Sequence, residues 1–341
     1  MKFDAAVLIE QGKDLEIVQL EVPKLEVGQV LVDVRASGVC GKQLAEINGE
    51  VGADSYLPHC LGHEGAGIVA DVGPGVSQVK AQDPVVLHWR PGRGIQALPA
   101  KYKNGTKKVG GGPVHTFQQF AIVSENRVTR HATDLSPERA ALFGCAVTTG
   151  LGAAINEACV RPGRSVCIVG CGAVGIFAVQ GARLVSATPI TVVDTNKARM
   201  DVATSCGASQ ALGPEAFQRM KGEYDVVIDT TGNAQAIEAA YDHVGPGGLL
   251  LLVGQPPAGT DVTFKNMRSH YCGKAMTDSQ GGRTDPTVDI PAYERLWRIG
   301  LLNLDLPLGK FSLARVNDAI RSARNGDTAR SMLMMGENNG E

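Results

Sequence analysis

The sequence predicts an α/β protein in which a doubly wound parallel sheet is joined to a second, mostly β domain. The apolar pattern changes near residue 147: short strand-like segments precede it, and apolar runs separated by helices of about 10–15 residues follow it. Such runs are typical of parallel strands that helices cover on both faces. With 341 residues and 42 glycines, the chain is long enough for two domains and for many tight turns.

The region before residue 147 is expected to consist of short strands. Alternating or β-branched segments occur, in chain order, at residues 6–9, 15–18, 30–34, 67–69, 85–87 and 120–123. Gly73-Pro74-Gly75 marks a turn in this series. One polar insertion, roughly residues 90–115, interrupts it. These segments predict a mostly β domain that carries a single insertion.

Helices and strands alternate after residue 147. In chain order we expect helix 147–158, strand 165–169, helix 174–185, strands 190–194, 225–229 and 249–253, amphipathic helices 292–300 and 313–325, and strand 331–334. The chain contains no repeats and no low-complexity linker. This alternation predicts the parallel sheet of the second domain.

A GxGxxG motif follows the predicted strand 165–169 and begins the next helix. In that context the first glycine permits a sharp turn, the second lets a pyrophosphate approach the backbone, and the third lets the helix pack on the sheet. The helix N-terminus offers amide donors and a favourable dipole to phosphates. The alternative to a dinucleotide-binding motif is a glycine turn without a ligand. The candidate cofactor-binding residues here are Gly170, Gly172, Ala173, Val174 and Gly175.

Asp194 ends the next strand, where an acidic residue would bind the adenosine ribose hydroxyls. The same carboxylate would repel a 2′-phosphate, which favours NAD over NADP. The alternative for Asp194 is a helix N-cap, and Arg199 is either a second contact to the adenosine side or a solvated helix charge. We therefore predict a Rossmann NAD-binding domain over residues 147–276, with residues 1–146 and 277–341 forming a catalytic domain.

Cys40, His63 and Cys145 supply two thiolates and one imidazole, the set that a catalytic zinc needs if one coordination position is to stay open. Taken singly, a cysteine is usually a core residue and a histidine a satisfied polar group. Cys60 and His63 also have a metal-like spacing, which leaves Cys60 as a competing ligand. The five remaining cysteines are most simply structural.

Residues 62–76 match the pattern GHE-x2-G-x5-G-x2-V at every fixed position. Segments 38–41, 144–150, 193–197 and 253–257 are similar to the same family in the same order. The chain thus resembles the zinc-type alcohol dehydrogenases of the medium-chain dehydrogenase/reductase superfamily over nearly its whole length, most weakly in residues 90–115 and 278–290. The resemblance implies a GroES-like fold for the catalytic domain.

The resemblance also implies roles for individual residues. Cys40, His63 and Cys145 would be the ligands of one catalytic Zn²⁺. Other positions would tune the metal (Glu64), face nicotinamide (Thr149), belong to the NAD-binding segments (Val253) and meet the pyrophosphate (Arg330). No cysteine lies between Cys60 and Cys145, so the structural zinc of many relatives is expected to be absent. Homodimers or homotetramers are implied as well.

Lys42 departs from the family pattern, which has serine or threonine at this position to start a proton relay. Gln43 replaces the usual aspartate, and Ala45 replaces a distal histidine. Lys42 could exchange the substrate proton through a lowered pKa, grip the pyrophosphate or an anionic substrate, or stay solvated. These roles remain open.

The insertion is basic. Residues 84–124 contain no Asp or Glu, and positive charges cluster over residues 90–108, at Arg90, Arg93, Lys101, Lys103, Lys107 and Lys108. This excess predicts an anion-attracting loop suited to phosphorylated or otherwise acidic small substrates. The alternative is an exposed, solubilising loop. His88, Trp89 and His115 flank the insertion and either line a cleft or pack in the core.

We expect an enzyme that interconverts an alcohol and an aldehyde or ketone with hydride transfer to and from NAD(H). A zinc-free quinone or alkene reductase of the same superfamily and a non-catalytic NAD-binding scaffold are the alternatives. A net charge of −2 and few aromatics speak against nucleic-acid binding. No run of 18 apolar residues or signal peptide occurs, and the scattered eight cysteines suit reduced thiols, so we expect no membrane association and a cytoplasmic location.

Overall fold

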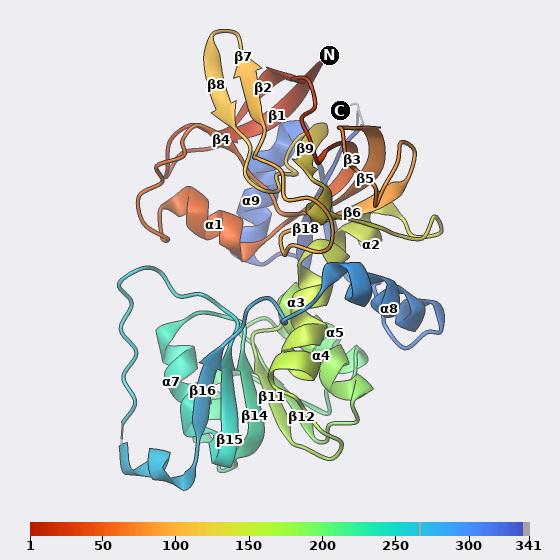
Figure 1. The fold of residues 1–341 in the computed structure, drawn as a ribbon. Coiled ribbons are helices and arrows are strands. Elements are labelled where there is room, and N and C mark those ends of the chain that lie inside the picture. The colour runs from red at the N-terminus through yellow and green to blue at the C-terminus, as the bar shows by residue number, and fades with distance from the viewer. Residues whose placement is uncertain (266, 337–341) are drawn as a thin grey trace. The chain divides into compact units, whose positions relative to one another are not determined.

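The computed structural model describes residues 1–265 and 267–336, and Figure 1 shows its fold. The chain forms two compact units. The first contains Met1–Cys145, Asp285–Ile299 and the described part of Pro307–Glu341, and the second contains Ala146–Thr284 and Gly300–Leu306. Residues 277–284 therefore lie with the second unit, because their strand pairs with the parallel sheet there.

The first unit contains two β structures. Its closed barrel has the strand order β1 (Lys2–Leu8), β2 (Glu16–Glu21), β7 (Lys101–Asn104), β8 (Lys107–Gly110) and β4 (His59–Cys60). Its sheet has the order β10 (Val128–Arg130), β6 (Pro84–His88), β5 (Glu64–Val72), β3 (Gln29–Val39), β18 (Arg330–Met334) and β17 (Leu308–Ser312), with β9 (Phe120–Ser124) paired to β3. The helices of this unit are α1 (Gly41–Asn48), α2 (Pro137–Ala141), α8 (Pro286–Arg298) and α9 (Val316–Asn325).

The alternation of β3 explains how it serves both cores. Val30, Val32 and Val34 join the cluster that contains buried residues of α9, whereas Leu31 joins the cluster that fills the barrel. Successive side chains of a strand point to opposite faces, so one strand borders two cores. α9 presents apolar residues to the first cluster at helical spacing and ends at Gly326, whose φ of 74° suits a glycine cap.

The second unit is a six-stranded parallel sheet. Its strand order is β13 (Gln210–Leu212), β12 (Ile190–Val193), β11 (Val166–Val169), β14 (Tyr224–Asp229), β15 (Val244–Leu252) and β16 (Ala275–Asp278). Its helices are α3 (Ala146–Gly152), α4 (Ala173–Leu184), α5 (Lys197–Ser205), α6 (Pro214–Arg219) and α7 (Ala234–Asp242). Every residue of β11 and β12 is buried, as expected for strands covered on both faces. The predicted combination of a parallel α/β sheet and a mostly β domain is confirmed.

The insertion of residues 90–115 holds more regular structure than the sequence predicts. β7 and β8 form an antiparallel hairpin that closes the barrel. Tyr102 and Val109 alternate with exposed lysines and point into the barrel core. Two buried side chains among many charges make a weak apolar signal, which explains why the insertion reads as a polar loop. Among the described residues, no helix combines the length and apolarity that a membrane crossing needs.

Candidate metal and cofactor sites

Cys40 lies where β3 ends and α1 begins. It is the N-cap residue of α1, and its backbone N–H donates to Gln43 Oε1 at 3.1 Å. The other end of the same amide lies close to the His63 ring, with Gln43 Nε2 2.6 Å from Nδ1. Gln43 is buried, and this one side chain contacts both the backbone N–H of Cys40 and the ring of His63.

Glycines allow the chain to pass close to His63. Gly62 has a φ of 96°, and a Cβ there would lie 2.4 Å from Thr116 Oγ1. A Cβ at Gly38 would lie 2.1 Å from the Glu64 carboxylate. These contacts explain why the motif needs glycine beside the histidine and before Cys40.

Cys145 follows a short 3₁₀ turn and precedes α3, and its side chain is buried. This turn lies against the sheet of the first unit, since a Cβ on Gly144 would be 2.3 Å from the Leu87 carbonyl oxygen. The backbone thus carries Cys145 to the start of β5, where His63 is located. Three segments far apart in the sequence supply the three side chains.

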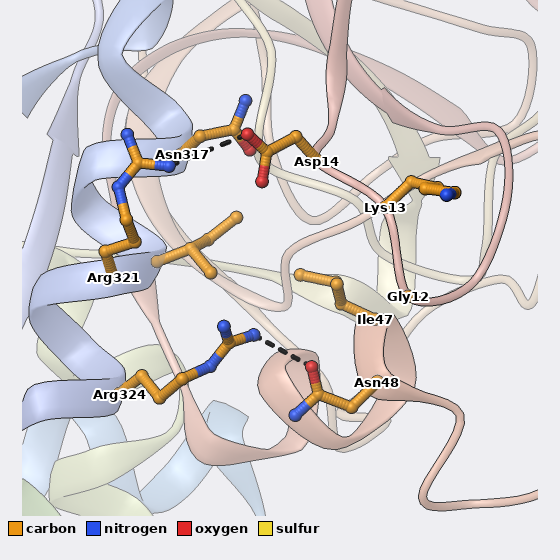
Figure 2. Close-up of a pocket in the computed structure, with 9 residues that line it drawn as sticks. Gly12, Lys13, Asp14, Ile47, Asn48, Asn317, Arg321 and Arg324 are labelled. Atoms are coloured by element: carbon orange, nitrogen blue, oxygen red, sulfur yellow. Dashed lines mark hydrogen bonds and ion pairs between the residues drawn. The ribbon is translucent and has the colours of Figure 1, made fainter.

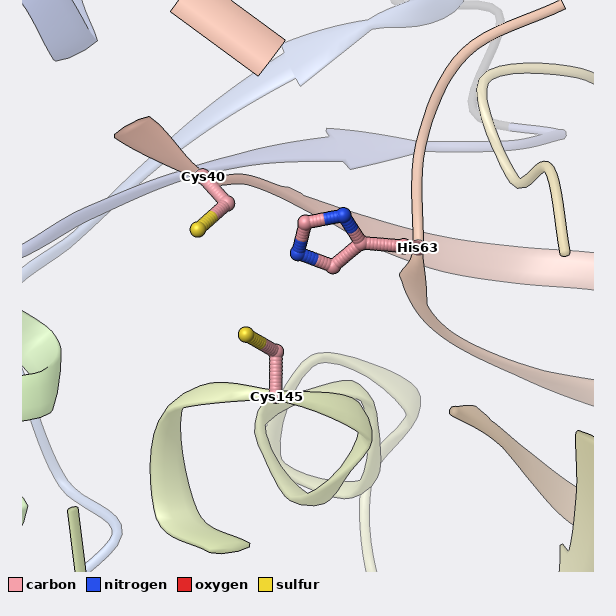
Figure 3. A group of neighbouring side chains, drawn as sticks. All are labelled: Cys40, His63 and Cys145. Carbon is pink, nitrogen blue, oxygen red and sulfur yellow. The ribbon is translucent and has the colours of Figure 1, made fainter. Parts of the chain in front are cut away.

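Figure 3 shows the side chains of Cys40, His63 and Cys145 pointing toward one another. Their ligand atoms all lie within 4.8 Å of one another. His63 Nε2 is buried and has no hydrogen-bond partner, whereas Nδ1 is contacted by Gln43. An orphaned imidazole nitrogen beside two sulfurs fits a zinc ion, which prefers this donor set. Among the described residues, the group of side chains that could hold a metal ion consists of the three predicted ligands.

The two sulfurs form a coupled pair. A hydrogen bond from Cys145 lowers the pKa of Cys40 well below its ordinary value, and Arg330 lowers it further. The same hydrogen bond, together with burial, raises the pKa of Cys145. The site therefore favours a thiolate at Cys40 before any metal binds, and a dication would replace the shared proton.

Glu64 and Arg330 form a buried ion pair beside this cluster. Arg330 Nε donates to Glu64 Oε1 at 2.9 Å, and Nη2 contacts Oε2, which makes the pair bidentate. The two residues are 266 positions apart and were expected to serve separate groups, the metal and the pyrophosphate. Their pairing on β5 and β18 is a tertiary contact that no sequence pattern signals.

Lys42 and Glu46 lie one helical turn apart on α1. Lys42 is half-buried. Burial raises the pKa of Glu46, although the positive charges of His63, Lys42 and His59 oppose that shift. His59 Nε2 lies 2.7 Å from Asp54 Oδ2. Glu46, His59 and Asp54 were not identified from the sequence as charged neighbours of the site. The i, i+4 spacing of Lys42 and Glu46 was the one signal in the sequence.

The three glycines of the cradle have separate structural reasons. Gly170 has a φ of 95°, which favours glycine. A Cβ on Gly172 would meet no heavy atom within 4 Å, so space lies open at the start of α4. A Cβ on Gly175 would be only 1.9 Å from the Gly170 carbonyl oxygen. This geometry fits a pyrophosphate on the helix N-terminus, beside Ala173 and Val174.

Asp194 lies at the carboxyl end of β12. Its Oδ2 accepts from the Cys171 N–H at 2.6 Å and its Oδ1 from the Asn196 N–H at 2.8 Å. The N-cap of α5 is Asn196, whose side chain accepts from the Arg199 N–H, so the N-cap alternative for Asp194 is wrong. Asp194 instead holds the glycine turn.

Val253 and Thr149 also belong to the second unit. Val253 directly follows β15, so it shares the carboxyl edge of the parallel sheet with Gly170 and Asp194. Ligands of open α/β sheets bind at this edge. Thr149 Oγ1 is buried without a hydrogen-bond partner, which leaves a hydroxyl available to a ligand.

Three polar residues that flank or compete with the site have structural roles. His88 bonds the Arg90 carbonyl and Thr129, and His115 bonds the Tyr102 hydroxyl. Burial lowers the pKa of each histidine to about 4. Cys60 lies in the barrel core, where burial raises its pKa, and it is outside the cluster.

The charges of the basic insertion divide into two groups. Arg93 lies 4.0 Å from Asp285, and Arg90 packs over the Trp89 ring. The four lysines lie on the hairpin, where Lys103 is directly opposite Lys108. In Figure 1 the tip of the β7–β8 hairpin points away from α1. The base of the hairpin adjoins β4, since Lys101 is opposite Gly110 and Gly110 pairs with His59.

Comparison with protein families matches most of the chain. Residues 26–133 match the alcohol dehydrogenase GroES-like domain, and residues 173–296 match the zinc-binding dehydrogenase family. S-(hydroxymethyl)glutathione dehydrogenase of Escherichia coli is 29% identical over 98% of this chain and 100% of its own length.

Solved structures show the same relationship. Benzyl alcohol dehydrogenase from Acinetobacter calcoaceticus is 25% identical, with a TM-score of 0.88 over 98% of this chain and 100% of that chain. A zinc-binding domain protein of the alcohol dehydrogenase type from Burkholderia ambifaria is 27% identical, with a TM-score of 0.86 over 98% and 99%. These matches span both units.

Proposed function

Because the chain belongs to the zinc-type alcohol dehydrogenase family of the medium-chain dehydrogenase/reductase superfamily, we propose that Cys40, His63 and Cys145 hold its catalytic zinc. The enzyme is NAD-dependent and interconverts an alcohol with an aldehyde or ketone. One observation carries the assignment of the ligands: three donor atoms converge, and the histidine nitrogen among them has no other partner. The family matches favour this function over a zinc-free reductase or a scaffold.

A bound zinc ion supplies Lewis-acid polarisation of the substrate oxygen. Cys40, His63 and Cys145 would hold the ion through three protein ligands, the number typical of catalytic rather than structural zinc sites. If His63 bound zinc through Nε2, its ring proton would reside on Nδ1, so the Gln43 amide would have to turn its oxygen toward Nδ1. Gln43 would then orient the ring, and the Cys40 N–H, which donates to Gln43 Oε1 in this structure, would lose that acceptor.

Bound NAD supplies the hydride acceptor. Gly172 would leave space for the pyrophosphate, Asp194 would accept from the ribose hydroxyls, and the unpaired Thr149 hydroxyl would face nicotinamide. A guanidinium has five N–H donors, and Arg330 directs its Nε and Nη2 to the Glu64 carboxylate. The remaining donors are those that we assign to a phosphate of the cofactor. We assign Arg199 and Val253 to the adenosine side and the sheet edge respectively.

The preference for an anionic substrate is assigned to Lys42 rather than to the hairpin lysines. Lys42 is half-buried and two residues from Cys40. The four hairpin lysines are exposed, and exposed charges are screened at physiological salt, so we expect them to contribute less. Lys42→Met should raise KM for a phosphorylated alcohol more than for a neutral one, whereas Lys107→Gln with Lys108→Gln should change neither. The reverse pattern would assign the preference to the hairpin.

A homodimer is proposed through the edge of the parallel sheet. β16 is the last strand of that sheet, and all four of its residues are exposed. Exposed Met276 and the 84% exposed Tyr271 add apolar surface nearby. An unpaired edge strand is a template for a second copy. Sedimentation should show a dimer that Thr277→Pro dissociates; a monomeric parent protein contradicts the proposal.

Metal analysis and a substrate screen test the function. We expect about one zinc per chain and NADH formation with alcohols that include benzyl alcohol and S-(hydroxymethyl)glutathione. Cys145→Ala should lose both metal and turnover. A metal-free preparation that reduces quinones, or full turnover by the metal-free variant, would overturn the assignment. The thiol content also leads us to propose a cytoplasmic location.

A further inference from the structure

We propose that the first unit contains a second binding site, a pocket that accepts a phosphate group. The pocket has a volume of about 100 Å³ and lies among the turn at Gly12–Asp14, the end of α1 and the outer part of α9. Figure 2 shows Arg321 and Arg324 on the α9 side of the pocket, whereas the Lys13 side chain, at its edge, extends away from these arginines. None of these residues belongs to the metal cluster or to the glycine cradle.

The walls of the pocket are held in place by hydrogen bonds. The Gly12 N–H donates to the Ile47 carbonyl at 2.6 Å, which fastens the turn to α1. Asn317 on α9 accepts from the Leu15 N–H and donates to the Leu15 carbonyl, each at 3.0 Å. Because both helices hold the same turn, the pocket is preformed and needs little ordering on binding.

Positively charged side chains outnumber negatively charged ones in the lining of the pocket. Arg321 is neutralised by Asp14 and Asp318. Arg324 instead donates to the neutral Asn48 Oδ1 at 2.8 Å. In the described part of the chain, no carboxylate forms an ion pair with Arg324 or Lys13. Two cations without counter-charges, one with a planar fork of donors, suit a small oxyanion.

The size and lining narrow the ligand class. The volume accommodates a phosphate group but no nucleotide. Ile47 and Ile320, both buried and apolar, supply the non-polar part of the lining. Arg324 is exposed, so its attraction for an anion should weaken as the salt concentration rises. The ligand is therefore inorganic phosphate or the phosphoryl end of a small monoester.

The test is phosphate binding by the zinc-loaded protein saturated with NAD, so that the cofactor's own phosphate sites are filled. We expect a saturable shift of the melting temperature with inorganic phosphate that chloride at equal ionic strength does not produce. Arg324→Gln should weaken phosphate binding about tenfold or more, since a charge-assisted bond is lost, and Lys13→Gln should also weaken it. Lys80→Gln removes an exposed charge elsewhere in the unit and should change nothing.

Glycerol 3-phosphate distinguishes the two sources. Tighter binding of this ester than of inorganic phosphate identifies a metabolite site, and the opposite order identifies an ion site. The proposal is overturned if neither ligand binds saturably, or if Arg324→Gln and Lys13→Gln retain the affinity of the Lys80→Gln control. Melting curves without phosphate establish that each variant is folded.

Discussion

Gly172 and Gly175 are expected to respond to the same substitution with opposite changes in stability. A Cβ on Gly172 meets nothing within 4 Å, and its φ of −68° and ψ of −178° suit any residue. Gly172→Ala should therefore raise the free energy of unfolding by about 0.4–1 kcal/mol through a less flexible unfolded chain. Its methyl group would occupy the space proposed for the pyrophosphate, so NAD affinity should fall by about tenfold or more.

Gly175→Ala should destabilise the second unit instead. Its Cβ would lie 1.9 Å from the Gly170 carbonyl oxygen, so α4 and the glycine turn must separate. Overpacking of this kind costs about 1–3 kcal/mol. The loss of NAD affinity then follows from displaced backbone rather than from a filled space.

Urea unfolding without cofactor and calorimetric titration with NAD measure the two effects. Gly213→Ala is the matched control, because Gly213 is also a helix N-cap in the second unit, and a Cβ there meets nothing within 4 Å. It should stabilise the protein as Gly172→Ala does and leave NAD affinity unchanged. Unaltered NAD binding by Gly172→Ala would refute the cradle, and a Gly175→Ala variant as stable as the parent would refute the packing argument.

Three further predictions concern the first unit. Arg330→Leu should lower the free energy of unfolding by about 3–5 kcal/mol, because it leaves Glu64 buried without its partner, and adding Glu64→Leu should recover most of that loss. Lowering the pH from 7 to 5 should lower the free energy of unfolding by about 2 kcal/mol for each of His88 and His115. Their folded pKa of about 4 lies below the unfolded value near 6.5, so protons bind the unfolded chain first and stability falls across that window. Gln43→Leu should weaken zinc binding about 10–100-fold, whereas Gln43→Glu should retain it.

Urea titrations and chelator competition provide the measurements for these predictions. A double variant no more stable than Arg330→Leu would show that the buried charge is not the cause. His115→Gln should reduce the pH dependence of unfolding, and an unchanged slope would count against a neutral buried histidine. Gln78→Leu, a substitution at an exposed glutamine, is the control for zinc binding. Equal zinc affinities of the Gln43→Leu and Gln78→Leu variants would show that Gln43 does not support the ligands.

The amino-acid sequence determined the parallel sheet, the position of the glycine cradle and the identity of the three metal-like ligands. These features depend on local requirements: apolar runs long enough for covered strands, a left-handed φ at Gly170 and donor types at Cys40, His63 and Cys145. Such requirements restrict residue type wherever the chain passes, so they can be read without coordinates.

Tertiary structure decided which distant side chains meet. It paired Glu64 with Arg330 across 266 residues, placed His88 and His115 in hydrogen-bonded interiors, and closed the barrel with a hairpin that carries four lysines. Long-range pairing depends on strand order, and sequence periodicity specifies only which face of an element is buried. Lys13 and Arg324, which line the pocket proposed to bind phosphate, are likewise separated by more than 300 positions in the sequence.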